Sequence, residues 1–290
     1  LIWDMNFNYL GDLFMNKVFK TGVAVAAAAL TASVVLPATA VSADSKTVTV
    51  GLVGTSDKGV WEEVAKTAKK KYGITIKTKV FTDYNQPNKA VADGSLDLNS
   101  FQHYYFLENW NKSNKNSVKA IGKTFITPIR LYSEKYKSVK KFKKGDAIAV
   151  PNDATNEARA LTLLQSAGLI TLKKGVDMPT VKDIKTNKLD LDIKEVAADQ
   201  TPSSLKSVDG AVINTNYAQQ AKLKLSSAIY VEPVNKDSKK WINIIAASKK
   251  NANKKIYKQV VKAYQTKATK DYLKKTWGQA EIPAWDITLK

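Results

Sequence analysis

The sequence predicts an α/β protein of two lobes joined by two crossover segments. Short apolar runs that are typical of buried strands, such as residues 47–53 and 147–150, are each followed by a helical pattern. This alternation favours parallel sheets with helices on their faces. Two further extended segments, residues 125–132 and 228–235, bound the β/α blocks. We interpret these two segments as the crossovers.

The first block opens with a β-α-β unit. After the strand at residues 47–53, an amphipathic helix is predicted over 58–72, with Gly73 ending it. Residues 74–81 then alternate apolar and polar side chains, as a half-buried strand does. Two shorter elements complete the block, a helix at residues 88–94 and a strand at 96–98.

The second block repeats the strand-to-helix order. The strand that begins at residues 147–150 leads into a predicted helix at 155–167, with Asp153 or Thr155 as its N-cap. Further strands are predicted at residues 190–196, 211–214 and 230–234.

The C-terminal region, residues 253–277, has the apolar periodicity of one long amphipathic helix, and we expect it to return to the first lobe. Lobe 1 is therefore predicted to comprise residues 44–127 plus 234–290, and lobe 2 residues 128–233. A ligand of such a protein usually binds between the lobes, near strand ends.

Residues 1–43 are predicted to be removed as upstream residues and a signal peptide. Lys17 precedes a run of small and apolar residues, and small residues lead up to Ala43, the expected cleavage site. The alternative is a retained membrane anchor. The uninterrupted apolar run at residues 23–36 is short for the roughly 20 residues that a spanning helix needs.

Composition excludes several kinds of site. The 290 residues include 46 Lys and Arg against 26 Asp and Glu, a net charge of +20, with one His and no Cys. Absence of cysteine in this sequence excludes disulfides, thiolate metal sites and a cysteine nucleophile. Only two basic residues, Arg130 and Arg159, are arginines, so lysine carries the charge.

The same counts lead to an expectation about location. Without a cysteine to carry a lipid, we expect a secreted, extracellular protein that is not lipid-anchored. Its charge would hold it at anionic cell-wall polymers. The alternative is that the lysines form an ordinary solvated surface.

The single histidine lies among aromatic residues after the predicted strand at 96–98. Phe101, Gln102, His103 and Tyr105 form a candidate ligand wall, in which aromatic rings contact an apolar group and a polar side chain orients it. The alternative is a turn between surface and core with a hydrogen-bonded histidine.

Arg159 lies about one turn inside the helix predicted at 155–167, whose N-terminus favours anions. Its guanidinium can pair with a carboxylate through two hydrogen bonds. The alternative is a surface ion pair with Glu157 or Asp153.

Asn214 ends the strand predicted at residues 211–214, and an asparagine can both donate and accept hydrogen bonds. The alternative is a simple Asx turn. An arginine, amides and aromatic rings together suit a small zwitterion with an apolar side chain, that is, an amino acid. The motifs of common hydrolases, nucleotide-binding proteins and zinc proteases are missing from this sequence, so no enzyme, metal or cofactor is expected.

At these motifs the chain resembles the methionine-binding lipoproteins of ABC importers, the NlpA/MetQ type. The likeness covers residues 47–286. The matching segments, in order, are residues 83–90, 98–107, 122–124, 151–161, 209–218, 263–265 and 283–285. Two features depart from the family pattern: the segment at residues 104–106, and the missing cysteine that normally carries the lipid.

The resemblance implies a type II periplasmic-binding-protein fold, capture of L-methionine or a close relative, and delivery to a membrane permease. It places the carboxylate clamp on Arg159 with Asn156 nearby, and an amide contact on Asn214. The implied aromatic and histidine walls are formed by Tyr84, Phe101, His103 and Tyr105. We expect a monomer that binds no nucleic acid. The alternative function is a cationic adhesin for anionic glycans or host matrix.

Overall fold

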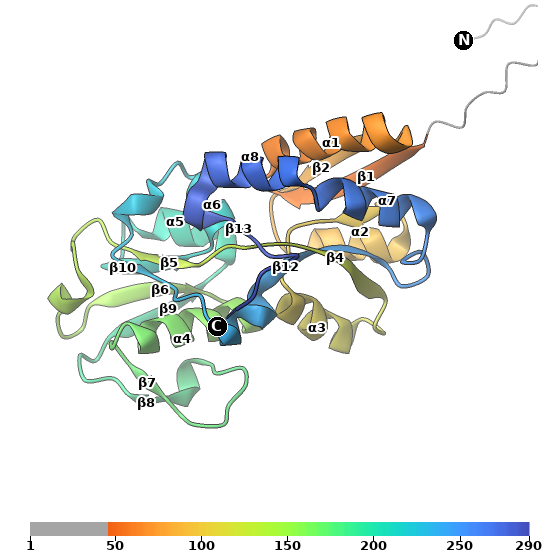
Figure 1. Ribbon diagram of the computed structural model, residues 1–290. Coiled ribbons are helices and arrows are strands. Elements are labelled where there is room, and N and C mark those ends of the chain that lie inside the picture. The colour runs from red at the N-terminus through yellow and green to blue at the C-terminus, as the bar shows by residue number, and fades with distance from the viewer. Residues whose placement is uncertain (1–45, 290) are drawn as a thin grey trace, which may run out of the picture. The chain divides into compact units, whose positions relative to one another are not determined.

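The computed structural model describes residues 46–289, arranged as two main sheets with helices around them (Figure 1). The predicted signal peptide in residues 1–43 lies outside the described residues. Within the described chain, no helix is both long enough and apolar enough to cross a membrane.

The first sheet has six strands in the order β13-β4-β12-β3-β1-β2. β1 pairs in parallel with β2 and β3, whereas β12 pairs antiparallel with β3 and β4. The strands are β1 (Thr47–Val53), β2 (Thr75–Phe81), β3 (Leu98–Asn99), β4 (Val118–Ile126), β12 (Ile242–Ser248) and β13 (Ile282–Pro283). The opening β-α-β unit is thus confirmed, but β12, a central strand, was not predicted.

Helices cover both faces of this sheet. Three of them, α1 (Lys58–Tyr72), α7 (Lys255–Tyr264) and α8 (Lys267–Trp277), pack on one face, where Ile245 of β12 joins their core. On the other face, α2 (Gln86–Asp93) and α3 (Tyr104–Ser113) cover Ile244. β12 is therefore apolar on both sides.

The predicted single helix at residues 253–277 is wrong. It divides into α7 and α8 because Thr266 takes an extended conformation, and its side chain accepts a hydrogen bond from the Thr269 N–H as an N-cap. The C-terminal helices do contact α1, as their apolar pattern predicts.

The second sheet has five strands in the order β11-β5-β10-β6-β9. β10 pairs in parallel with β6 and antiparallel with β5. The strands are β5 (Arg130–Tyr132), β6 (Ala147–Pro151), β9 (Asp192–Val196), β10 (Gly210–Ile213) and β11 (Tyr230–Val231). The helices around it are α4 (Ala154–Ser166), α5 (Thr201–Ser204) and α6 (Thr215–Gln220), and a small hairpin is formed by β7 (Thr171–Leu172) and β8 (Ile184–Thr186).

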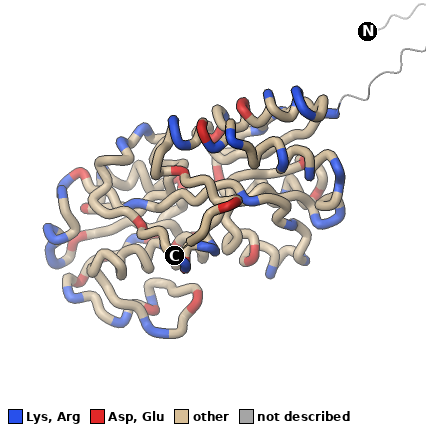
Figure 2. The backbone as a smooth tube through the Cα atoms, viewed as in Figure 1, with Lys and Arg blue, Asp and Glu red and all other residues tan. Residues whose placement is uncertain are grey.

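The chain passes between the sheets twice, from β4 to β5 and from β11 through a 3₁₀ segment (Lys236–Trp241) to β12. These passages fall in or next to the two segments predicted as crossovers. The predicted class, α/β with two β/α bodies, is confirmed. Lysines and arginines are scattered over both bodies, interspersed with acidic residues (Figure 2).

Candidate functional site

A cavity with about 360 Å³ of unfilled space, solvent at its mouth included, is lined by residues next to the strands of both sheets. Six of the seven predicted ligand residues line it: Tyr84, Phe101, His103, Asn156, Arg159 and Asn214. They come from loops and helix starts next to strand ends, so topology unites segments far apart in sequence. Among the other lining residues are Phe106, Thr127 and Asn216, which are not among the seven predicted ligand residues.

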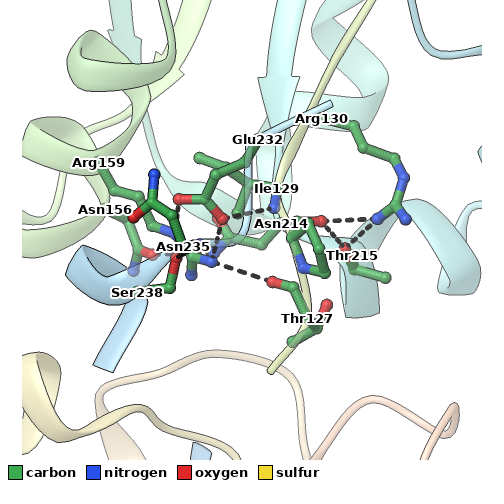
Figure 3. A network of polar contacts seen from close by, with 11 residues as sticks. Thr127, Ile129, Arg130, Asn156, Arg159, Asn214, Thr215, Glu232, Asn235 and Ser238 are labelled. Atoms are coloured by element: carbon green, nitrogen blue, oxygen red, sulfur yellow. Dashed lines mark hydrogen bonds and ion pairs between the residues drawn. The ribbon is translucent and has the colours of Figure 1, made fainter. Parts of the chain in front are cut away.

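Arg159, on α4, is 2% exposed and is held by a buried ion pair (Figure 3). Its Nε donates to Glu232 Oε1 at 2.7 Å and its Nη2 to Glu232 Oε2 at 2.5 Å. Nη2 also donates to the Thr127 carbonyl at 3.0 Å. Among residues 46–289, no group accepts a hydrogen bond from Nη1, which leaves that nitrogen for a ligand. The partner is Glu232, so neither alternative pairing of Arg159, with Glu157 or with Asp153, is formed.

Trp241 supports the same guanidinium from another side. The Arg159 Cζ atom lies 4.7 Å from the Trp241 ring centroid, a cation–π contact, and the His103 ring is 5.0 Å away in an edge-to-face arrangement. Trp241 ends the 3₁₀ segment of the second passage between the sheets. Trp241 therefore links the second passage between the sheets to Arg159 and His103.

Hydrogen bonds that run from Asp153 through Asn156 fix the side chain of Asn214. Asp153, the N-cap of α4, accepts from the Asn156 N–H and from Asn156 Nδ2, which lies 2.9 and 3.0 Å from its two carboxylate oxygens. Asn156 Oδ1 then accepts from Asn214 Nδ2 at 2.9 Å. The Asn214 Oδ1 atom is buried and has no donor in the described part of the chain. It is an acceptor positioned at the cavity.

His103 is the N-cap of α3, and its Nδ1 accepts from the Phe106 N–H at 3.0 Å. The proton of the neutral ring must therefore lie on Nε2. Burial and the Arg159 charge lower the pKa of His103 well below 6.5, although the adjacent Asn156 amide opposes this shift. Nε2 is buried without a hydrogen bond to any described residue, so it is a donor available at the cavity.

Three aromatic rings form the apolar wall. The ring centroids of Tyr84, Phe101 and Phe106 lie 5.7 to 5.9 Å from one another. The Tyr84 hydroxyl donates to Asn216 Oδ1 at 2.7 Å, and burial raises the Tyr84 pKa well above 10. Tyr84 is thus a neutral, anchored part of the wall.

Tyr105 is the predicted residue that the structure does not bring to the cavity. Its hydroxyl donates to the Asp177 carbonyl at 3.0 Å, and its ring packs edge-on to Trp241. It follows His103 by two positions on α3, so its side chain points to another side of the helix. Glu232 and Trp241, which do hold Arg159, were missed. The only signal for Glu232 is that it is the one acid in the predicted crossover segment at residues 228–235.

The polar atoms at the cavity that have no hydrogen-bond partner among the described residues match the polar groups of an amino acid. Arg159 Nη1 and His103 Nε2 can donate to a carboxylate, whereas Asn214 Oδ1 can accept from an ammonium group. The aromatic wall can contact an apolar side chain, including a thioether. Within residues 46–289, no three His, Cys, Asp or Glu side chains gather as metal ligands.

Comparison with known proteins extends this description. Residues 48–285 match the family model described as NlpA lipoprotein. The D-methionine-binding lipoprotein MetQ of Salmonella typhi is 39% identical over 246 residues, 83% of this chain and 90% of the relative. Lipoprotein 28 of Escherichia coli K12 is 36% identical over 248 residues, 84% of this chain and 90% of the relative.

Solved structures agree. A nutrient-binding protein from Burkholderia cenocepacia bound to methionine is 41% identical, with a TM-score of 0.78, covering 82% of this chain and 99% of that one. The substrate-binding protein of a methionine transporter from Streptococcus pneumoniae is 44% identical, with a TM-score of 0.77, covering 83% and 96%.

These relatives contradict the predicted location. The matched family and several relatives are named lipoproteins, which implies lipid anchoring, so the expectation of a protein without a lipid anchor is wrong. The error came from concluding too much from a missing residue type. Absence of cysteine in this sequence bears on one covalent linkage and does not decide how the protein is attached.

Proposed function

Because this chain belongs to the NlpA lipoprotein family, we propose that it is the substrate-binding protein of an ABC importer and captures L-methionine or a close relative. The observation that carries the proposal is the set of open polar atoms around the cavity. Two buried donors and one buried acceptor face a space that is walled by aromatic rings. The relatives do not support the alternative of an adhesin, and the family is one of binding proteins, not enzymes.

In the proposed complex, Arg159 Nη1 and His103 Nε2 hold the ligand carboxylate. Asn214 Oδ1 accepts from the ammonium group, and Asn156 keeps that amide oriented. Tyr84, together with the neighbouring phenylalanines, contacts the thioether side chain, since sulfur packs favourably at aromatic ring edges. Segments that are far apart in the sequence thus contact the carboxylate, the ammonium group and the side chain of one ligand.

We further propose that residues 44–127 plus 234–290 and residues 128–233 are the two lobes that close around this ligand. In support, the first sheet is built from strands before Thr127 and after Val234, and the second from strands between them. Two passages between the sheets suit a hinge. The closed form would then dock on the permease as a monomer. Contact of the lysines with anionic wall polymers stays a prediction.

Isothermal titration of the protein, freed of bound ligand by unfolding and refolding, with L-methionine and D-methionine tests the function. We expect saturable binding of at least one enantiomer. Asn214→Ala should weaken it by about tenfold or more, because it removes a buried hydrogen bond to a charged group. Asn253→Ala, at an exposed asparagine without side-chain hydrogen bonds, is the matched control. Absence of binding by the unmodified protein would overturn the proposal.

A further inference from the structure

We propose that Glu232 makes this cavity selective for zwitterions over acids of the same shape, because it cancels the charge of Arg159. The inference rests on the proposed function and concerns the ligand class of the same site. It assigns Glu232 a role in specificity, although Glu232 is not among the residues that line the cavity.

The pairing of Glu232 uses both of its oxygens. Oε1 accepts from Arg159 Nε, and Oε2 accepts from Arg159 Nη2 and from the Ile129 N–H at 3.3 Å. The Glu232 side chain is 11% exposed and that of Arg159 is 2% exposed. Donors on both oxygens match an ionised, acceptor-only carboxylate. The pair is thus fixed in geometry and neutral in sum.

Arg159 is the one charged side chain among the described residues that line the cavity. Arg130, outside the lining, directs its guanidinium to the Thr215 hydroxyl and the Pro128 carbonyl. His103 is neutral by the hydrogen bonding of its Nδ1, and Asp153, behind Asn156, adds a carboxyl group. Lys240 lies over the rings of Tyr105 and Trp241 and is likewise outside the lining. Arg159 therefore offers a carboxylate directed donors, while Glu232, the acid paired with it, offsets the attraction that its charge would exert on an anion.

A buried, neutral site penalises any ligand that carries a net charge, because the ligand loses its hydration without a counter-charge. A zwitterion brings its own compensation, and its ammonium group satisfies Asn214 Oδ1. An acid with a hydroxyl in place of the amino group can still donate a hydrogen bond to that oxygen, but it brings a net charge of −1. Removal of the Glu232 charge would leave Arg159 uncompensated and would favour the acid.

The experiment compares L-methionine with 2-hydroxy-4-(methylthio)butanoate, which has the same side chain and carboxylate but no amino group. Isothermal titration gives the ratio of the two dissociation constants for the unmodified protein and for Glu232→Gln. We expect the unmodified protein to prefer methionine by about 100-fold or more, and Glu232→Gln to reduce this ratio by about tenfold or more. Glu134→Gln, at an exposed glutamate just after β5, makes the same change in net charge and should leave the ratio unchanged.

The ratio separates selectivity from a merely structural role. If Glu232 only holds Arg159 in place, Glu232→Gln weakens both ligands equally, and an unchanged ratio would overturn the inference. Glu232→Asp keeps the charge and should keep the ratio even where it weakens both ligands.

A measurement on the unmodified protein covers the case in which Glu232→Gln does not fold. Methioninol, an amine without the carboxylate, should also bind about 100-fold or more weakly than methionine, because a neutral cavity penalises both singly charged analogues. Binding of the hydroxy acid as tight as that of methionine would overturn the inference and leave the proposed function intact. Failure to bind methionine itself would overturn the function.

Discussion

Two pairs of ionisable residues lie close to the cavity, and their charges are compensated in opposite ways. Arg159 and Glu232 carry opposite charges and neutralise each other through two hydrogen bonds. Asp57 and Glu281 are both acids, and they line an adjoining space of about 320 Å³ that shares Phe101 with the cavity.

Proton binding reduces the negative charge of the Asp57–Glu281 pair. Burial raises the pKa of Asp57 to about 6, and burial together with the nearby Asp57 charge raises that of Glu281 well above 4.5. Glu281 Oε1 accepts from Gln219 Nε2 at 2.9 Å, while Oε2 has no partner among the described residues. Two neighbouring acids with raised pKa values are neutral only at low pH, whereas an ion pair is neutral across the physiological range. The two regions should therefore respond differently to mutation and to pH.

The largest expected effect comes from breaking the ion pair. Arg159→Met should abolish methionine binding and lower the free energy of unfolding by about 3–5 kcal/mol, because it leaves Glu232 buried without a partner. The double variant with Glu232→Leu should regain most of that stability but no binding. Urea denaturation and calorimetric titration measure both quantities. Equal stability of the single and double variants would show that the pair is not a compensated unit.

The acid pair should make stability fall as pH rises. Because the folded-state pKa values lie above the unfolded ones, the folded protein binds more protons, and this contribution is lost as pH rises from about 4 through about 6 and beyond. Glu281→Gln removes one titrating group, so it should reduce the loss between pH 5 and pH 8 by an amount on the order of 1–3 kcal/mol.

Urea denaturation at the two pH values provides that comparison, with Glu134→Gln as the control for net charge. A pH dependence identical in the Glu281→Gln variant and the unmodified protein would contradict the assignment of the proton to this pair.

A smaller effect is expected at the link between the acid pair and the second sheet. Gln219, on α6, provides the hydrogen bond donor for Glu281, which follows α8. Gln219→Leu should lower the free energy of unfolding by about 1–2 kcal/mol, since it leaves a buried carboxyl oxygen without its donor. Gln220→Leu, at the exposed neighbouring position, should change stability little. If the two variants are equal, the hydrogen bond does not contribute.

The fold was predictable where the pattern of apolar residues is periodic. The strand at Thr47–Val53 and the helix at Lys58–Tyr72 have the predicted bounds, because the strand begins with alternating Thr and Val and the helix has one apolar stripe that ends at Gly73. β12 was missed because both of its faces are buried, and a continuous apolar run does not distinguish a strand from a helix. The break at Thr266 depends on a local N-cap inside an otherwise unbroken helical pattern.

The site was predictable to the extent that its residues follow strand ends, which the topology brings together. What the sequence did not reveal is how these residues are supported. The Arg159 partner lies 73 residues away in the chain, and no local pattern identifies Glu232 as that partner. Trp241, likewise, precedes the strand that was missed. The remaining error was the side of α3 from which Tyr105 projects, since Tyr105 is buried close to His103 without reaching the cavity.

The smallest effect concerns Tyr105, whose only link to the ion pair is its ring contact with Trp241. Tyr105→Phe keeps that contact and loses the hydrogen bond to the Asp177 carbonyl, so the dissociation constant for methionine should change by no more than about twofold. Tyr84→Phe removes the same atom from a residue that lines the cavity, where the hydroxyl orients Asn216, and should weaken binding by about tenfold. Calorimetric titration of both variants decides between the two tyrosines. A larger effect of Tyr105→Phe would contradict this ranking. The hydrogen bond to Asp177 would then matter for binding, and Tyr105 would act through closure of the two lobes rather than through contact with the ligand.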